Sequence, residues 1–138
     1  MSKVLFNLSG HPLPDGTPTT GYSQVIDIKI PNIEMGDEQS ILTSVIDLVN
    51  EMIDNSSELI IEQGNYDLIP PGMAPISLVL ISILHGITGH FPNIRFIYKS
   101  NDGFKLAGFA LKLQDLRINA RELRKSNDPI AFFRGGGS

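Results

Sequence analysis

Two short loops contain the residues of this sequence that could take part in chemistry. The first follows the apolar run KVLFNL (3–8) and contains Ser9, Gly10 and His11, with Asn7 just before it. A histidine changes its charge near neutral pH, so His11 could bind an anion or transfer a proton. A loop histidine that only hydrogen-bonds to the backbone is the alternative interpretation.

The second loop is LIPPGMAP (68–75), which joins a short apolar run to a long one. A turn before a helix ordinarily offers Ser, Thr, Asp or Asn as the N-cap, whereas this one offers Ala74 followed by Pro75. The uncapped amides of residues 73–76, the proline excepted, would form a positive helix terminus that can hold a phosphate. Gly72 would let a ligand approach the backbone closely. A rigid Pro-Gly turn without a ligand explains this loop equally well.

Other familiar catalytic patterns are missing from the sequence. It has no cysteine, which excludes disulfides, thiolate metal sites and cysteine nucleophiles. His85 and His90 are five residues apart, which does not align their side chains on one helical face, so we reject a metal site. The end of a helix explains His85, and a turn or an interface explains His90. Ser9 has no evident Ser/His/Asp partners, and the carboxylates form no recognisable acid/base pair.

Composition limits the classes of protein and partner. The chain has 138 residues, of which 41% are hydrophobic, so we expect one domain over 1–134, with Gly135–Ser138 as a linker or tail. A formal charge of −4 disfavours binding to duplex DNA. The sequence has neither an apolar stretch long enough to span a bilayer nor a signal-peptide pattern, so we expect no membrane partner and a cytoplasmic location. We expect no cofactor and no metal.

Hydrophobic periodicity predicts the elements that would position the two loops. Strands are predicted over 3–8, 24–30, 66–69, 94–99 and 104–113, the last two joined by a hairpin turn at SNDG. Helices are predicted from an Asp37 cap, over 75–87, and from near Gln114. Residues 56–65 fit a strand or one more helical turn. Arg117, Arg121 and Arg124 follow one face of the last helix, either as a solvated face or as a contact for phosphate or a partner's acids.

This order of elements predicts a three-layer, Rossmann-like α/β domain with a mainly parallel sheet and an antiparallel strand at its C-terminal end. In such sheets, ligands collect beyond the carboxyl ends of the parallel strands, where the strand order reverses. We therefore expect the two loops to meet at that edge. An NAD-type enzyme is a poor hypothesis because no Gly-x-Gly-x-x-Gly fingerprint follows the first strand.

Three blocks of the sequence resemble a small family of proteins encoded with type III CRISPR systems and grouped with the ring nucleases. They are NLSGHPLP (7–14), PPGMAPISLVLISILHGITGHFPNIRF (70–96) and LKLQDLRINAR (111–121). The first is similar to the family's Asn-x-Ser-His-Pro-Leu signature, with a glycine inserted before His11. The segment that follows is short and rich in Gly, Thr and Pro, where relatives have a helix.

The resemblance implies a dimeric, CARF-like protein that binds a cyclic oligoadenylate second messenger, with four nucleotides in the ring, and lowers its free concentration. It implies metal-independent cleavage, in which a ribose 2′-OH attacks the adjacent phosphate and Ser9 or His11 orients the reacting oxygens. Ligand binding is expected at the residues of both loops: Asn7, Ser9, Gly10, His11, Pro71, Gly72, Met73 and Ala74.

Two alternatives remain at this stage. The same pocket could sequester the ring without cleaving it, since only preferential stabilisation of the transition state gives catalysis. A bivalent form of this alternative holds one ring between two dimers, which would make assembly depend on the ligand. The chain could also be a nucleotide-free interaction module that uses its apolar helix and its arginines for assembly alone.

Overall fold

A five-stranded sheet forms the centre of the protein, and the computed structural model describes residues 3–123. Its strand order is β2-β1-β3-β4-β7. The first four strands are parallel and β7 is antiparallel to β4. The strands are β1 (Lys3–Asn7), β2 (Tyr22–Asp27), β3 (Tyr66–Ile69), β4 (Asn93–Ile94) and β7 (Leu111–Lys112). The predicted α/β fold with a mainly parallel sheet is confirmed, and it is compatible with a Rossmann-like domain.

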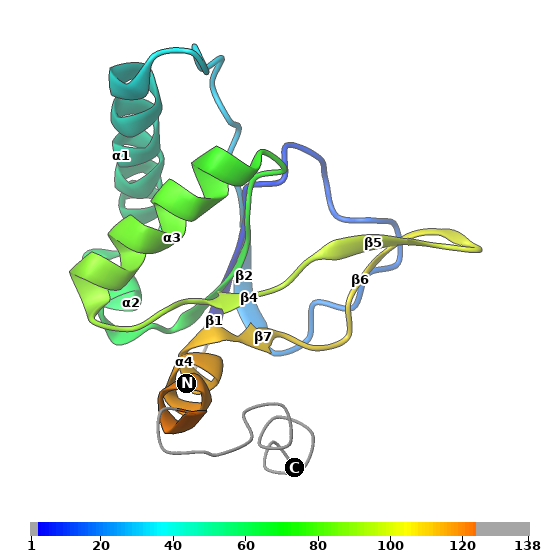
Figure 1. Ribbon diagram of the computed structural model, residues 1–138. Coiled ribbons are helices and arrows are strands. Elements are labelled where there is room, and N and C mark those ends of the chain that lie inside the picture. The colour runs from blue at the N-terminus through cyan, green and yellow to red at the C-terminus, as the bar shows by residue number, and fades with distance from the viewer. Residues whose placement is uncertain (1–2, 124–138) are drawn as a thin grey trace.

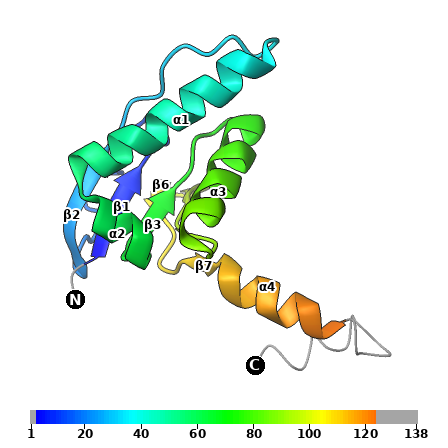
Figure 2. The same cartoon turned by 90° about the vertical axis from the view of Figure 1, so that its left-hand side faces the viewer.

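Three helices cover one face of the sheet, as Figures 1 and 2 show. They are α1 (Glu38–Asn55), α2 (Glu58–Gln63) and α3 (Ala74–Thr88). The predicted cap of α1 is confirmed, because the Asp37 carboxylate accepts a hydrogen bond from the Gln39 amide at 3.1 Å. The ambiguous segment forms the helix α2, which the Ser57 hydroxyl caps by accepting from the Ile60 amide at 3.2 Å.

The hydrophobic core lies between these helices and the sheet. Alternate residues of β1 and β3 point toward it, as the two-residue period of a strand requires. The helices contribute residues at helical spacing, and burial of each large side chain contributes roughly 1.5–3 kcal/mol. The buried residues of this core include Val4, Phe6, Leu8, Val45, Leu48, Met52, Tyr66, Leu68, Ile76, Leu80 and Leu84.

The opposite face of the sheet carries a hairpin and the loop that follows β1 (Figure 1). A three-layer domain would have helices on this face, but among residues 3–123 the hairpin and the loop lie there instead. Leu5, Asn7 and Asp67 are buried but lie outside the helix-side core. They alternate with the core residues along their strands, so their side chains point toward this second face.

Two of the predicted strands are each interrupted, and one part of each forms the hairpin. The predicted strand over 94–99 divides into β4 and β5 (Ile97–Ser100), and the one over 104–113 divides into β6 (Gly103–Leu106) and β7. The prediction of two continuous strands was therefore wrong. Their antiparallel pairing is confirmed, both between β4 and β7 and between β5 and β6. The division coincides with contacts across the hairpin: the Arg95 guanidinium donates to the Ala107 carbonyl, and the Ala107 amide donates to the Phe96 carbonyl at 2.9 Å. These bonds tie both ends of the hairpin together where it leaves the sheet.

The last described helix, α4 (Leu113–Glu122), begins one residue before the predicted Gln114 and has no buried residue. Arg117 and Arg121 are exposed on it. Arg124 and the predicted tail at 135–138 lie outside the described residues. Among residues 3–123, no helix combines the length and hydropathy needed to cross a membrane.

Candidate functional site at the carboxyl edge of the sheet

The two loops leave the sheet side by side. Asn7 and Ile69, the last residues of β1 and β3, are in register, and the Leu8 amide donates to the Ile69 carbonyl at 2.9 Å. The strand order reverses here, because the chain places β2 on one side of β1 and β3 on the other. Figure 1 shows both connections beginning at this edge. The edge therefore has the topology of a ligand-binding crevice in an open α/β sheet.

Asn7 organises the first loop with its side chain. Its Nδ2 donates to the His11 carbonyl and to Asp27 Oδ1, both at 2.7 Å. Its Oδ1 accepts from the Ser9 amide at 3.1 Å and from the Ser9 hydroxyl at 2.7 Å. These four bonds use the whole hydrogen-bonding capacity of an asparagine amide. Asn7 is also only 2% exposed, so its side chain fixes the shape of the loop and is not placed to contact a ligand directly.

Ser9 is engaged by the same loop. Its hydroxyl lies 2.7 Å from Asn7 Oδ1 and 3.0 Å from the His11 carbonyl, and it accepts from the His11 amide at 3.2 Å. The hydroxyl has one proton, which these two acceptors already receive. Ser9 could transfer a proton to a ligand only after this loop rearranged.

His11 is exposed, and its imidazole has no hydrogen bond to any residue from 3 to 123. The bonds that hold this residue all use its backbone, which leaves the ring free to meet a ligand. Gly10 precedes it with a φ of 85°, in the left-handed region that favours glycine, and this turn directs His11 out of the strand.

The second loop ends in a helix terminus without a side-chain cap, as predicted. Met73 is the N-cap residue of α3, and no side-chain hydrogen bond caps this end. The Ser77 hydroxyl holds the loop by donating to the carbonyl of the buried Pro71 at 2.6 Å. Gly72 and Ala74 are exposed, and a Cβ built on Gly72 would meet no atom within 4 Å. A side chain at position 72 would therefore fit the fold while occupying the space in front of the helix terminus.

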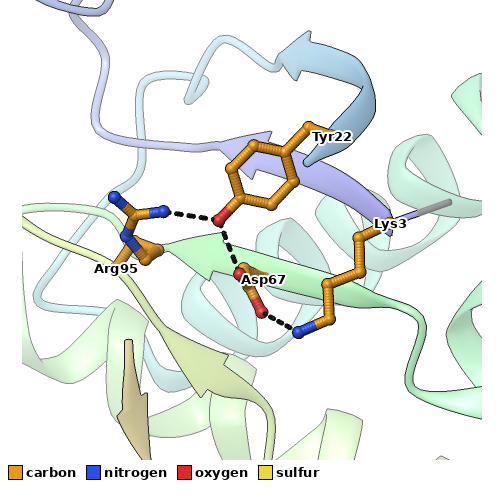
Figure 3. Close-up of polar contacts among 4 residues, drawn as sticks. All are labelled: Lys3, Tyr22, Asp67 and Arg95. Atoms are coloured by element: carbon orange, nitrogen blue, oxygen red, sulfur yellow. Dashed lines mark hydrogen bonds and ion pairs between the residues drawn. The ribbon is translucent and has the colours of Figure 1, made fainter. Parts of the chain in front are cut away.

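A polar network lies on the face of the sheet that carries the hairpin, and the sequence did not predict it. Figure 3 shows a chain of contacts in which Lys3 and Tyr22 both reach the Asp67 carboxylate and Arg95 reaches the Tyr22 oxygen. Asp67, 4% exposed, accepts from the Tyr22 hydroxyl at 2.5 Å and pairs with the Lys3 ammonium at 3.2 Å. Arg95 Nη1 donates to the Tyr22 oxygen at 2.7 Å. The one available signal was an acidic residue inside the apolar run YDLI.

This network is suited to holding strands together rather than to proton transfer. Burial, followed by the hydrogen bond to Asp67, raises the pKa of Tyr22 to about 12, so the phenol stays neutral near pH 7. The Asp67 carboxylate already has two donors. The network as a whole joins β1, β2 and β3 to the root of the hairpin, and it therefore fixes where the hairpin leaves the sheet.

The remaining histidines lie away from this edge. The His85 ring packs against Phe91 with a centroid distance of 4.2 Å, and its Nε2 is buried without a hydrogen-bond partner among the described residues. His90 is exposed in the turn after α3, where its amide donates to the Thr88 hydroxyl at 3.0 Å. Within residues 3–123, no group of three His, Cys, Asp or Glu side chains could hold a metal ion.

A shallow pocket occurs where β3 and β4 begin, at the end of the sheet opposite the two loops. Its lining includes Tyr66, His90, Phe91 and Gln114, and contains no Lys, Arg, Asp or Glu side chain. It therefore offers little to a charged ligand, and the carboxyl edge remains the better candidate for an anion.

Comparison with protein-family models, curated proteins and solved structures finds no match to this chain. A functional assignment consequently depends on the chemistry of these residues and on the sequence blocks described above.

Proposed function

We propose that this chain is a CARF-like, cytoplasmic protein that binds a cyclic oligoadenylate, with four nucleotides as the expected ring size, and lowers its free concentration. The observation that best supports the proposal is the meeting of the two loops at the strand-order reversal, where β1 and β3 end in register. The ring would lie across this edge, with a phosphate at the start of α3 and the first loop beside it.

Three features of the edge suit a phosphate. The first-turn amides of α3 have no side-chain cap, and Pro75 is the only residue there without an amide hydrogen. The helix dipole adds roughly 0.3–1 kcal/mol of attraction at an exposed site. The exposed imidazole of His11 can donate a hydrogen bond to a second phosphate oxygen or to a ribose hydroxyl.

Cleavage at this site would proceed without a metal. The ribose 2′-oxygen would attack the adjacent phosphorus, the bond to the 5′-oxygen would break, and the products would be a 2′,3′-cyclic phosphate and a 5′-hydroxyl. His11 would accept the proton of the 2′-OH, water would supply a proton to the departing 5′-oxygen, and backbone amides would stabilise the charge on the phosphate. With one proton-transfer group, the expected turnover is slow.

The geometry of Ser9 favours sequestration as a second candidate function. Its hydroxyl is occupied by Asn7 and by the His11 carbonyl, which leaves His11 as the proton-transfer candidate among the residues that directly follow β1. A pocket with this inventory binds the ring in the ground state and gains little in the transition state.

The homodimer belongs to the same proposal, and α3 supports it. This helix contains no Asp, Glu, Lys or Arg, yet Leu78 is 67% exposed and Ile87 is 46% exposed. Leu78 borders an apolar groove between α1 and α3 that also includes Leu42 and Ile83. A second copy would remove this surface from water. Leu78→Glu should then shift the sedimentation coefficient to that of a monomer, whereas Leu59→Glu on α2, at a residue 57% exposed, should not.

The binding test uses stoichiometric protein and labelled cyclic tetra-adenylate, followed by a native gel and denaturing chromatography. Bound, intact ring indicates sequestration, and linear products ending in a cyclic phosphate indicate a nuclease. His11→Ala and Gly72→Leu should each weaken binding about tenfold or more, because one removes a donor to a charged group and the other fills the phosphate position. His90→Ala is the matched control. Equal weakening by all three variants, with folding intact, would contradict this placement of the site.

A further inference from the structure

The segment that forms the hairpin differs in charge from the rest of the chain. Residues 95–112, which include the hairpin and both of its flanks, contain four of the 11 basic residues but one of the 15 acidic residues. Within 97–106, the hairpin itself, the charged residues are Lys99, Lys105 and Asp102. The hairpin β5–β6 projects from the face opposite the helices (Figure 1). A basic projection on an otherwise acidic protein is complementary to an anionic partner.

A group of aromatic rings, which we call the aromatic platform, lies along the hairpin and its two flanks: Phe96 just before β5, Tyr98 within β5 and Phe109 after β6. The Phe96 ring lies 5.5 Å from Phe109 and 6.3 Å from Tyr98, between ring centroids. The outer two rings remain open, since Tyr98 is 44% and Phe109 is 58% exposed. Solvent-exposed aromatic rings are suited to a flat partner that stacks on them. A two-stranded hairpin is only marginally stable in water by itself, so such a partner would also stabilise it.

The hairpin register places a positive charge beside the platform. Tyr98 pairs directly with Lys105 across the two strands, so both side chains lie on one face. The Lys105 ammonium also lies 3.5 Å from the Asp102 carboxylate, but both side chains are exposed, and such a surface pair is weak enough for a phosphate to compete with it. The next pair, Lys99 and Phe104, lies on the other face. The hairpin thus has two faces of similar composition, but only one extends into a set of contacting rings.

The root of the hairpin is held in a fixed position. Arg95 bonds to the Ala107 carbonyl and to the Tyr22 hydroxyl, which in turn bonds to the buried Asp67. Because these contacts anchor both strands of the hairpin to the central sheet, the platform is ordered before any ligand arrives, which lowers the entropic cost of binding.

From these observations we propose that the aromatic platform binds unpaired nucleobases of a single-stranded oligonucleotide. Bases would stack on Tyr98 and Phe109, and the Lys105 ammonium would contact a neighbouring phosphate. A duplex is a poor ligand because its bases are already stacked on one another. The required chemistry is present both in a linear RNA strand and in a cyclic oligoadenylate, so this inference does not need the ring to bind at the carboxyl edge.

The test measures binding of the full chain to labelled linear octa-adenylate RNA and to cyclic tetra-adenylate, with duplex RNA as a negative control. Tyr98→Leu and Phe109→Leu should each weaken binding of at least one single-stranded ligand about tenfold, whereas Tyr98→Phe retains it. The matched control is Phe104→Leu, at a residue 64% exposed on the other face, which should leave affinity unchanged. Lys105→Gln should reduce the slope of log affinity against log salt by about 0.7.

Other outcomes would overturn the inference. Equal weakening by Phe104→Leu and Tyr98→Leu would mean that the platform has no special role. Loss of self-association in Tyr98→Leu, seen by sedimentation without any RNA binding, would mean that a second copy covers the rings. Binding of cyclic tetra-adenylate that depends on His11 but not on Tyr98, without binding of linear RNA, would support the proposed function and contradict the role of the aromatic platform. Binding of linear RNA through Tyr98, without any binding of the ring, would do the reverse.

Discussion

Replacing Asn7 with aspartate tests whether the first loop is held as described. The change keeps the shape of the side chain but removes both Nδ2 donors, which serve the His11 carbonyl and Asp27 Oδ1 at 2.7 Å each. Two lost hydrogen bonds cost about 2 kcal/mol. The new carboxylate would also face that of Asp27, and at this partly solvated edge their repulsion adds about 1 kcal/mol. We therefore expect the free energy of unfolding at pH 7 to fall by about 3 kcal/mol.

The pH dependence of this loss identifies its cause. Repulsion from Asp27 raises the pKa of the introduced carboxyl in the folded state above its unfolded value. A group with a raised folded pKa stabilises the protein below its unfolded pKa, and this stabilisation disappears as the pH rises through the folded value. At about pH 4.5, the protonated carboxyl can donate to Asp27, so the difference from the unaltered protein should shrink to about 1 kcal/mol.

Urea denaturation of both proteins at pH 7 and pH 4.5 measures the two differences. Asn32→Asp, in an exposed loop, is the control for the chemical change itself and should alter stability by less than about 0.5 kcal/mol at either pH. If Asn7→Asp lowers stability equally at both pH values, the close approach of Asn7 to Asp27 is wrong.

Removing the Tyr22 hydroxyl with Tyr22→Phe should cost about 1–3 kcal/mol in urea denaturation, because a bond to a buried carboxylate is lost. The pKa of Tyr22 is raised from 10 to about 12, so the stabilisation that this group gives is complete below pH 10 and disappears toward pH 12. The variant should therefore lack this part of the decrease in the free energy of unfolding at alkaline pH. Gly89→Ala should destabilise by about 1 kcal/mol because its φ is 77°, whereas Gly86→Ala within the same helix should stabilise by about 0.4–1 kcal/mol; equal thermal shifts would contradict the assigned end of α3. Ser77→Ala should lower stability by about 1 kcal/mol through loss of the 2.6 Å bond to the Pro71 carbonyl, and an unchanged melting temperature would show that this bond contributes nothing.

Several features of the fold were predictable because their causes are local. The Asp37 cap and the apolar spacing of α1 lie within neighbouring helical turns, as does the uncapped start of α3. The SNDG turn likewise specifies its own hairpin. The meeting of the two loops also followed from the order of elements, because parallel strands bring their carboxyl ends to one edge.

The roles of individual site residues were less accessible. Ser9 was proposed as a residue that orients reacting oxygens, and that role stays a prediction, but the structure shows its hydroxyl already bonded within the loop. The partner that completes the Asn7 amide is Asp27, twenty positions away on a neighbouring strand. No periodicity in the sequence indicates such a pair.

The sequence alone determined most of the helices and parallel strands, residues 56–65 excepted, and which two loops lie at the carboxyl edge of the sheet, since these follow from spacing within a few residues and from the parallel order of the strands. Tertiary structure alone decided where the strands over 94–99 and 104–113 leave the sheet, and that Lys3 and Tyr22 bond to Asp67 while Arg95 bonds to Tyr22. The physical reason is sequence separation: Lys3 and Asp67 are 64 positions apart, and packing of the sheet is what brings the partly exposed Lys3 ammonium to the buried Asp67 carboxylate.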